Sequence, residues 1–390
     1  MLVRILTLGV CVVSAFSVAA QVSQGPKNVP EFKPAFSNQT RASELPQRPE
    51  FDVTIVQSGF EVPWAIEVMP GGGYLVTERP GRLRAVLPGR GMTNIAGVPE
   101  VVTQRQGGLL DVALAEDFET SRRIYLTYSK PVGRRSVTAA GTGVLNADFT
   151  QLSDFVDIFV GNPPSNSPMH YGSRIVLDGD LAYITSGEHS SRETRVLAQD
   201  LRTTYGKVLR ITLDGEPAPG NPFAGQPDAD PRIYTYGHRN PQGADLHPTT
   251  GELWTLEHGP RGGDELNQIV AGANFGWPIV SYGENYSGAP VGTGRSSAPG
   301  LTEPRYYWDP VIAPGGFAFY EGEMFDWQGD IIASSLSPGG IVRLTLEGNS
   351  VTGEARYLPD LGRVRDIEID ADGAILAVND DGNLVRITPR

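Results

Sequence analysis

The feature that most constrains the fold of this chain is a two-strand sequence motif that occurs six times after residue 50. In each copy an alternating strand is followed by a Gly, Asp or Pro turn and then by a second strand rich in Tyr, Leu, Ile and Thr. The copies begin at Trp64, Leu110, Ser173, Gly243, Gly316 and Arg365. Further strands follow several of them, at residues 81–87, 206–213, 340–348 and 382–389. Each copy therefore predicts a four-stranded antiparallel sheet.

Six such sheets predict an all-β, six-bladed β-propeller. A short sheet cannot bury both of its faces alone, and radial stacking into a ring solves this problem and protects the edges. The strand near Phe51 is expected to close the ring beside the last blade. The alternative is a pair of β-sandwiches, but that architecture does not explain why the same strand-turn-strand motif occurs six times. Only residues 193–202 indicate a short helix.

The first twenty residues differ from the rest of the chain. Arg4 is followed by an almost unbroken apolar run and then by small residues before Gln21, which is typical of a cleavable signal peptide. The alternative is a buried N-terminal helix. The only cysteine, Cys11, lies in this segment, so the mature chain is expected to have no disulfide and no thiol ligand. Residues 1–20 thus predict export to the periplasm or the outside.

The remaining chain divides into two parts. Residues 21–50 are polar and contain five prolines, which predicts a linker or an arm wrapped on the surface. Residues 51–390 are expected to form a single propeller domain. The formal net charge of −13 argues against nucleic acid as a partner, and no apolar run in this part is long enough to cross a membrane.

Polar or glycine-rich elements precede the first strand of five copies. They are residues 106–108, 170–174, 238–243, 313–316 and 362–366. Loops at one mouth of a propeller carry function, so these elements are expected to line one cavity. For any single Arg or Asn, capping of a loop is the alternative.

The second strands of three copies end in acids, at Glu78, Glu188 and Glu257. Glu257 opens the densest motif, EHGPRGGDE, whose carboxylates and backbone carbonyls suit a hard cation such as calcium. A tight, solvated acidic turn is the alternative that spacing alone favours. No HExxH, GxSxG, P-loop or GxGxxG pattern supports zinc, serine-hydrolase, nucleotide or nicotinamide chemistry.

Several motifs together resemble the soluble quinoprotein glucose/sorbosone dehydrogenase family, and its bacterial aldose sugar dehydrogenases in particular. They include QGGLLDVAL, HYGSR, YGHRNPQG, EHGPRGGDELNQI, GANFGWP, YYWDPVIAPGGFAFY and RVRDI, and the similarity covers roughly residues 50–390. The resemblance implies a six-bladed propeller that holds pyrroloquinoline quinone (PQQ) and calcium at the mouth of its funnel. It also implies oxidation of aldose sugars at C1, with hydride transfer to the quinone and a lactone as product.

The resemblance also implies roles for individual residues. His170 resembles the catalytic base, Glu188 the acid that orients it, and Gln106 a glutamine at the edge of substrate and quinone. Residues expected to contact or support the quinone are Arg239, Asn240, Asp264, Trp308, Arg363 and Arg365. The carbonyls of Gly259 and Pro260 match the catalytic calcium site, and Glu265 with the Phe275 carbonyl matches a second, structural calcium site.

The chain departs from the family pattern in one loop. Many members place a quinone-contacting lysine where this chain reads SSLSPGG at residues 334–340, so Arg363 and Arg365 are expected to carry most of the pairing with the cofactor carboxylates. A propeller that only binds a ligand or partner, or a calcium-dependent lactonase, is the alternative function. The sequence specifies neither the preferred sugar, nor the electron acceptor, nor the oligomeric state.

The histidines divide by context. His170 precedes an inner strand beside Gly172 and Ser173, so it is expected to project into the funnel mouth, a packed loop histidine being the alternative. His189 is expected to be exposed and His247 solvated in a turn. His238 and His258 lie in the motifs around the expected cofactor site.

Overall fold

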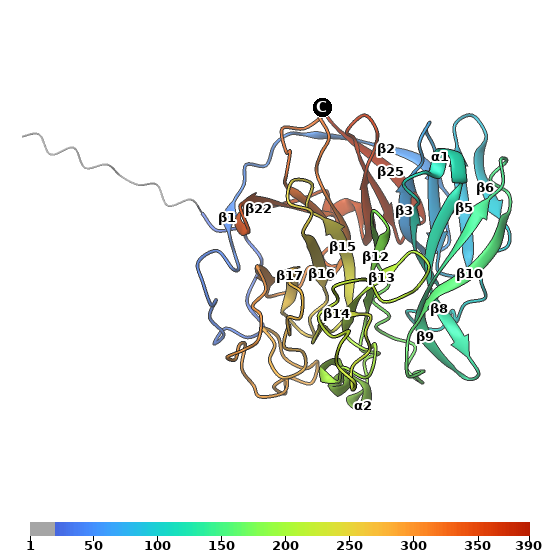
Figure 1. Cartoon of the computed structure of the whole chain (residues 1–390). Coiled ribbons are helices and arrows are strands. Elements are labelled where there is room, and N and C mark those ends of the chain that lie inside the picture. Colours follow the sequence, from blue (N-terminus) through green and yellow to red (C-terminus); the bar gives the residue numbers. More distant parts are fainter. Residues whose placement is uncertain (1–19) are drawn as a thin grey trace, which may run out of the picture.

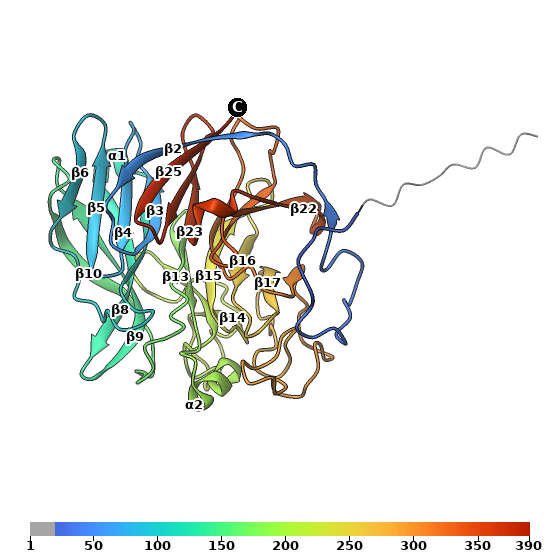
Figure 2. The ribbon, with the colours of Figure 1, turned by 180° about the vertical axis from the view of Figure 1, so that it is seen from behind.

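The computed structural model describes residues 20–390, so the predicted signal peptide lies almost entirely outside the described residues. Six sheets are arranged around a central axis, and the helix α2 and the C-terminus lie at opposite ends of the molecule (Figures 1 and 2). The predicted six-bladed propeller with four-stranded antiparallel blades is confirmed.

The blades follow one another along the chain, each from its inner to its outer strand. Blade one contains β3 (Pro63–Val68), β4 (Tyr74–Glu78), β5 (Arg82–Leu87) and β6 (Gly91–Ile95). Blade two contains β7 (Leu109–Leu114), β8 (Arg123–Val132), β9 (Arg135–Leu145) and β10 (Leu152–Val160). Blade three contains β11 (Ile175–Asp178), β12 (Leu181–Ser186), β13 (Lys207–Thr212) and β14 (Ile233–Tyr236).

The other three blades complete the ring. Blade four contains β15 (Pro241–Leu246), β16 (Leu253–Glu257), β17 (Asp264–Gln268) and β18 (Tyr306–Trp308). Blade five contains β19 (Pro314–Phe319), β20 (Ile331–Ser335), β21 (Ile341–Glu347) and β22 (Ser350–Tyr357), with β1 (Ser43–Glu44) added in parallel at its outer edge. Blade six contains β23 (Val364–Ile369), β24 (Ile375–Asn379) and β25 (Asn383–Pro389).

The N-terminal strand β2 (Phe51–Ser58) closes the ring. It pairs antiparallel with β25, so the outer strand of blade six comes from the start of the domain, as the sequence predicts. Neighbouring inner strands contact one another in order, and β23 contacts β3. Closure in this way joins the two ends of the domain in one sheet.

Apolar side chains fill the spaces between blades rather than a single central core. One cluster joins Trp64 and Leu75 of blade one to Leu109 and Leu126 of blade two. Such contacts bury the faces that a lone sheet would expose, and each fully buried side chain of this size stabilises the fold by about 1.5–3 kcal/mol. The central axis is therefore left to polar groups.

Residues 20–50 lie along blades four and five. The backbone N–H groups of Asn28 and Val29 donate to the Asp309 carboxylate, at 2.8 and 2.9 Å. The Gln24 side chain is buried and donates to Glu354 on β22 at 2.7 Å. These contacts tie the segment to the propeller.

Helical segments are short. The expected helix near residues 193–202 is α2 (Arg192–Arg195), followed by the 3-10 turn η1 (Val196–Gln199), and Ser191 caps it through the Thr194 N–H. Two more short segments are α1 (Phe118–Ser121) and η2 (Pro359–Leu361). Within residues 20–390 no helix has the length and apolar character needed to cross a membrane.

Candidate active site at one mouth of the funnel

A cavity of about 220 Å³ lies where the inner strands begin. Its lining residues are Trp64, Arg79, Gln106, Gln242, His258, Ala313, Leu336, Arg363 and Arg365. Most of them lie in or just before the inner strands β3, β7, β15, β19 and β23. The others, Arg79, His258 and Leu336, directly follow the second strand of a blade. The expectation of one shared cavity is therefore confirmed for four of the five elements, in blades two, four, five and six. Residues 170–174 of blade three do not line it, and blade one contributes Trp64 and Arg79 instead.

Irregular register re-aims side chains into this cavity. The pairing of an inner strand with its neighbour shifts between Pro63 and Ala65, between Pro241 and Gly243, and between Val364 and Asp366. A β-bulge turns a side chain that a regular strand would place elsewhere. The skipped residues are Trp64, Gln242 and Arg365, and all three line the cavity.

His170 and Glu188 form a buried pair beside this cavity. The Nδ1 atom of His170 lies 2.8 Å from Oε1 of Glu188, and the other carboxylate oxygen accepts the Ser190 N–H at 2.8 Å. Only 5% of His170 is exposed and Glu188 is fully buried. Burial, together with the positive charges of Arg239 and Arg195, lowers the pKa of His170 well below its ordinary value. The ring is therefore a neutral imidazole whose Nδ1–H points to the carboxylate.

Close backbone packing fixes the position of His170. The residue has a φ of +48°, which a side chain other than glycine rarely adopts. A Cβ atom on Gly187 would lie 2.1 Å from the His170 carbonyl oxygen, so only glycine permits this approach. The His170 N–H donates to Oε1 of Gln106 at 2.7 Å, which connects the histidine to the wall of the cavity.

The HRNPQG segment is fastened by Glu257. One oxygen of this carboxylate accepts the Arg239 N–H at 2.6 Å and the other lies 2.8 Å from Nδ1 of His238. Nη1 of Arg239 donates to the His258 carbonyl at 2.9 Å, while its Nε is buried and has no partner among residues 20–390. Oδ1 of Asn240 accepts the Gly172 N–H at 3.0 Å. Arg239 and Asn240 thus lie next to the histidine loop.

Asp264 joins two walls of the site. It is buried and accepts the N–H groups of Gly259, Ile312 and Ala313 at 2.8, 2.9 and 2.6 Å. Within residues 20–390 no hydrogen bond ends on the carbonyl oxygen of Gly259 or Pro260. Two backbone oxygens of this loop are therefore available to a cation.

Glu265 and Phe275 lie in the same neighbourhood. Glu265 is the cross-strand partner of Glu257, and Phe275 stacks on His238 at 4.6 Å between ring centroids. Burial, and then the charge of Glu257, raises the pKa of Glu265 well above its ordinary value. Two carboxylates thus lie close together in a small volume. Among the described residues no basic side chain forms an ion pair with Glu265.

Arg363 and Arg365 share one carboxylate. Nε of Arg363 and Nε of Arg365 lie 2.8 and 2.6 Å from Asp380, and Nη1 of Arg363 donates to the Leu336 carbonyl at 3.0 Å. Burial raises the pKa of Asp380, but the bonds from the two arginines outweigh it and hold that pKa below its ordinary value. Arg363 therefore also holds the loop at residues 334–340.

One expectation about position is wrong, and a second residue, Trp308, lies deeper than the cavity wall. His189 is only 1% exposed, because its ring packs edge-on against Tyr171 and Tyr205 at 5.0 and 4.7 Å, so the expected exposure is wrong. Trp308 is fully buried against Tyr306 in the apolar cluster between blades four and five and does not line the cavity. The aromatic residue that does line it is Trp64.

Sequence reasoning missed Trp64 and Arg79 as lining residues, whereas Gln242 lies in the element at residues 238–243 that was expected to line the cavity. The repeat contains a signal for Arg79, because this residue directly follows the acid that ends β4, as His258 follows the acid that ends β16. The bulges that re-aim Trp64 and Gln242 leave no comparable trace in the sequence.

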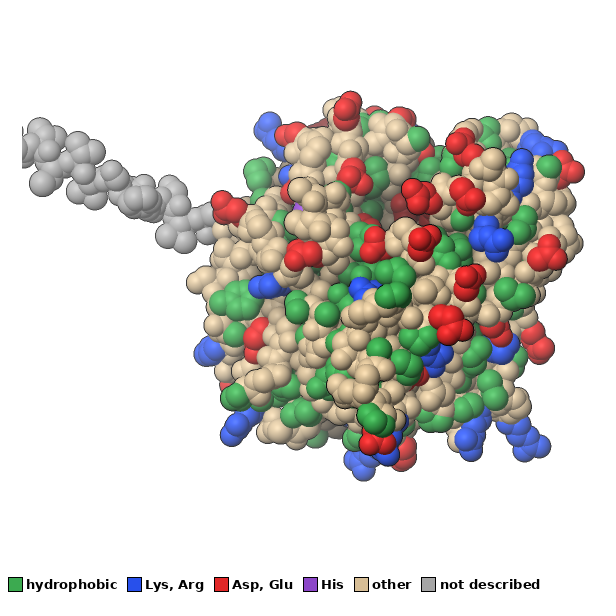
Figure 3. Space-filling model, viewed as in Figure 1, with side chains coloured by type: hydrophobic (Ala, Val, Ile, Leu, Met, Phe, Trp, Pro, Cys, Tyr) green, Lys and Arg blue, Asp and Glu red, His purple; other side chains and the backbone are tan. Residues whose placement is uncertain are grey.

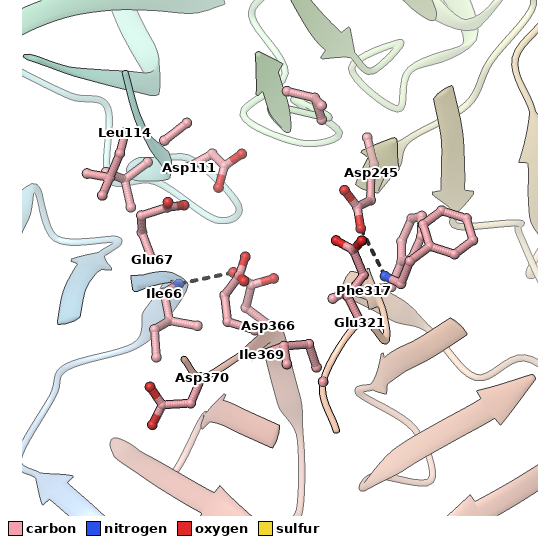
Figure 4. A pocket seen from close by; sticks show the side chains of 18 of the residues that line it. Ile66, Glu67, Asp111, Leu114, Asp245, Phe317, Glu321, Asp366, Ile369 and Asp370 are labelled. Carbon is pink, nitrogen blue, oxygen red and sulfur yellow. Dashed lines mark hydrogen bonds between the residues drawn. The ribbon is translucent and has the colours of Figure 1, made fainter. Parts of the chain in front are cut away.

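A second cavity, of about 680 Å³, lies where the inner strands end. Nine acidic residues and one basic residue line it, and Figure 4 shows Glu67, Asp111, Asp245 and Asp366 directed into this space. Acidic side chains also gather on the upper part of the face shown in Figure 3. The basic residue is Arg174.

Arg174 separates the two cavities. It lies 2.7 Å from Asp111 and 2.9 Å from Asp366, and its Nε donates to the Gln242 carbonyl at 3.1 Å. Its guanidinium also covers the Trp64 ring at 4.7 Å from the centroid. An ion-paired arginine therefore lies between the two cavities.

The propeller fold and the mouth just described define an oxidoreductase of the glucose/sorbosone dehydrogenase type. The chain belongs to this family, because the family model described as Glucose / Sorbosone dehydrogenase matches residues 60–386.

Relatives and solved structures agree with this assignment. The aldose sugar dehydrogenase YliI of Escherichia coli is 39% identical over 349 residues, which cover 87% of this chain and 93% of the relative. The apo-form structure of the soluble aldose sugar dehydrogenase from Escherichia coli superposes with a TM-score of 0.84 at 37% identity, over 87% of this chain and 100% of that one. The PQQ-bound aldose sugar dehydrogenase from Streptomyces coelicolor has a TM-score of 0.71 at 27% identity, over 87% and 99%.

Proposed function

We propose that this protein oxidises aldose sugars at C1 with PQQ and calcium, to give the lactone. The observation that carries the proposal is the buried His170–Glu188 pair at the edge of an arginine-lined cavity. Oxidation of a lactol removes a proton from the C1 hydroxyl and a hydride from C1, so the site needs a base and an acceptor. His170 supplies the first and the cofactor the second.

His170 is suited to take the hydroxyl proton. With Nδ1–H directed to Glu188, the lone pair of Nε2 is free to accept a proton, and the carboxylate stabilises the imidazolium that forms. A pKa below the ordinary value keeps the ring neutral through the physiological range. Gln106 holds the backbone of His170 and lines the cavity, so it is placed to contact the sugar as well.

The residues around the cavity fit an anionic quinone. PQQ carries carboxylate groups, and Arg363 and Arg365 offer two guanidinium groups that share only Asp380. The buried, unpartnered Nε of Arg239 is a further donor. When bound, PQQ supplies the two-electron acceptor. Asn240 and Asp264 hold the surrounding loops, and Trp308 supports them from the core.

The chain also offers ligands for calcium. The carbonyls of Gly259 and Pro260 receive no hydrogen bond from the described residues, and oxygen donors of this kind suit Ca²⁺. Glu265, with the Phe275 carbonyl, is proposed for a second site, where a cation would relieve the crowding of Glu257 and Glu265. We further propose that residues 1–20 are a signal peptide that exports the enzyme.

The experiment combines cofactor binding with turnover. Apo-protein is incubated with PQQ and calcium, freed of unbound cofactor, and assayed for quinone absorbance and for sugar-dependent reduction of a dye. We expect both to appear together. Chelation should then lower quinone retention and the melting temperature, because a ligand bound only to the native state stabilises it. Quinone binding without turnover on any aldose would favour a binding protein, and no quinone binding at all would refute the proposal.

A further inference from the structure

Three arginines line the cavity at the starts of the inner strands and form what we call its cationic wall. Two of them, Arg363 and Arg365, are already proposed to bind the cofactor, and the third has no role so far. Arg79 follows β4 in blade one and lines the same cavity as Arg363 and Arg365 of blade six. Burial, and then the positive charge of the nearby Arg365, lowers the pKa of Arg79, although Asp380 acts in the opposite direction. Like charges are gathered here in spite of their repulsion, which is a cost that the folded protein bears without its ligand.

Arg79 has no acidic partner of its own. Its Nε donates to the Gly107 carbonyl at 3.2 Å and its Nη2 to the Arg105 carbonyl, and no ion pair of Arg79 occurs within residues 20–390. Asp380 is the carboxylate that serves Arg363 and Arg365. Three guanidinium groups therefore meet one carboxylate, which leaves an excess of about two positive charges at the cavity wall.

The backbone at Arg79 packs closely against the loop that precedes β7. A Cβ atom on Gly108 would lie 2.3 Å from the Arg79 carbonyl oxygen, so the glycine is required for the strand and the loop to approach each other. The two carbonyl bonds hold the loop at residues 105–107 against the guanidinium. Gln106, which bonds to the His170 backbone, lies in that loop. Arg79 thus borders both the cavity and the segment that positions the histidine.

We propose that Arg79 is a third cofactor-binding arginine, and that it supplies from blade one the positive charge that the lysine-free loop at residues 334–340 does not. The inference rests on the proposed function, because it takes PQQ as the ligand. With Arg363 and Arg365 it gives a carboxylate-rich quinone charge-assisted contacts from two blades.

The test measures binding without turnover. Trp64 lines the cavity, so quenching of tryptophan fluorescence reports PQQ binding to apo-protein in calcium buffer. The variants are Arg79→Gln, which keeps a donor for the Gly107 carbonyl, Arg365→Ala as the comparison within the wall, and Arg90→Gln as a matched control at an exposed position. We expect Arg79→Gln to raise the Kd for PQQ about 10-fold or more, in the range of Arg365→Ala, and Arg90→Gln to leave it unchanged.

Salt dependence distinguishes a charge contact from support of the loop. Removing one charge contact should make the dependence of log Kd on log salt less steep in Arg79→Gln than in the parent, and a purely structural role would leave that slope unaltered. Arg79→His provides a second variant whose charge titrates. Relative to the parent, its PQQ affinity should fall as the pH rises through the pKa of the imidazole.

The outcomes separate the two claims. If the parent fails to bind PQQ, the proposed function is wrong. If the parent binds PQQ while Arg79→Gln has the parental Kd and salt slope, the function stands and the assignment of Arg79 is wrong. A pH-independent affinity ratio between Arg79→His and the parent would overturn the assignment even if Arg79→Gln did not fold.

Discussion

The two cavities lie at opposite ends of the inner strands and have opposite charge. At the starts of the strands, arginines line a space of about 220 Å³, and at their ends nine acidic residues and Arg174 line one of about 680 Å³. The first cavity adjoins a histidine–carboxylate pair and irregular backbone, whereas the second is built from the regular ends of strands. The scaffold is thus symmetric, and the difference comes from side chains and bulges.

The comparison shows that backbone strain and like-charge repulsion are concentrated at the cationic end of the propeller. Around the cationic cavity the register of inner strands shifts, the neighbouring His170 has a positive φ, and three arginines are gathered in one wall. Such features persist only where surrounding structure holds them, and they concentrate at functional sites. The acidic end has no comparable backbone outlier in its inner strands among the described residues. Substitutions at the cationic end should therefore change the rate of catalysis, and substitutions at the acidic end should change the free energy of unfolding.

The largest expected effect is on turnover at the cationic end. His170→Ala should leave PQQ and calcium bound and lower kcat about 10²–10⁴-fold, the usual contribution of a general base. In the parent, kcat/KM should fall only at a pH below the ordinary range of histidine, because burial and nearby arginines lower the pKa of His170. Steady-state kinetics across pH with quinone-saturated enzyme measures both.

His247→Ala is the matched control for this experiment. His247 lies in the turn after β15, away from the cavity, and its substitution should preserve kcat. A His170→Ala enzyme that keeps full turnover on every sugar oxidised by the parent would remove this residue from the mechanism.

The fold was predictable from the sequence because repetition amplifies a weak signal. One alternating strand pair fits many folds, but six copies at the same structural point fit a ring, and the copies from Trp64 to Arg365 all became inner strand pairs. The added strand β1 was not predictable, because residues 43–44 are stabilised as a strand only by contact with β22. Pairing over such a separation has no local signature.

The positions of site residues were predictable where they belong to a motif that is continuous in the sequence. The histidine, its carboxylate and Gln106 come together as the resemblance implied. The lining by Trp64 and Gln242 depends on bulges, and the burial of His189 depends on Tyr171 and Tyr205 from other segments. Trp308 has the apolar environment of a core residue, and nothing in its local sequence distinguishes that from the wall of a cavity.

The next effect concerns the boundary between the cavities. Arg174→Met removes the partner of Asp111 and Asp366 and should destabilise the fold by about 3–5 kcal/mol, since it leaves buried carboxylates unpaired. Burial already raises the pKa of Asp111 to about 7, so protonation can relieve this loss. The deficit in unfolding free energy should therefore be smaller at pH 5 than at pH 8, as measured by denaturant titration.

Arg202→Met is the control for that change. Arg202 forms an ion pair with Asp200, but 70% of its side chain is exposed, so its loss should cost no more than about 1 kcal/mol. Equal losses in the two variants, or a deficit for Arg174→Met that does not depend on pH, would show that Arg174 does not act as the charged boundary.

The smallest expected effect is at the acidic end. Burial, and then the charges of Asp111 and Asp366, raises the pKa of Glu67 to about 8 from an ordinary value near 4.5. Between these two values the folded protein keeps a proton that the unfolded chain has released, so the free energy of unfolding decreases as the pH rises through this window. Glu67→Gln removes this dependence and should stabilise the protein at pH 8 by on the order of 1 kcal/mol, with little change at pH 4.5. The exposed Glu347→Gln should show no such difference. Equal stabilisation of Glu67→Gln at both pH values would mean that Glu67 is not held in its protonated form, and that the acidic end carries its full negative charge at this position.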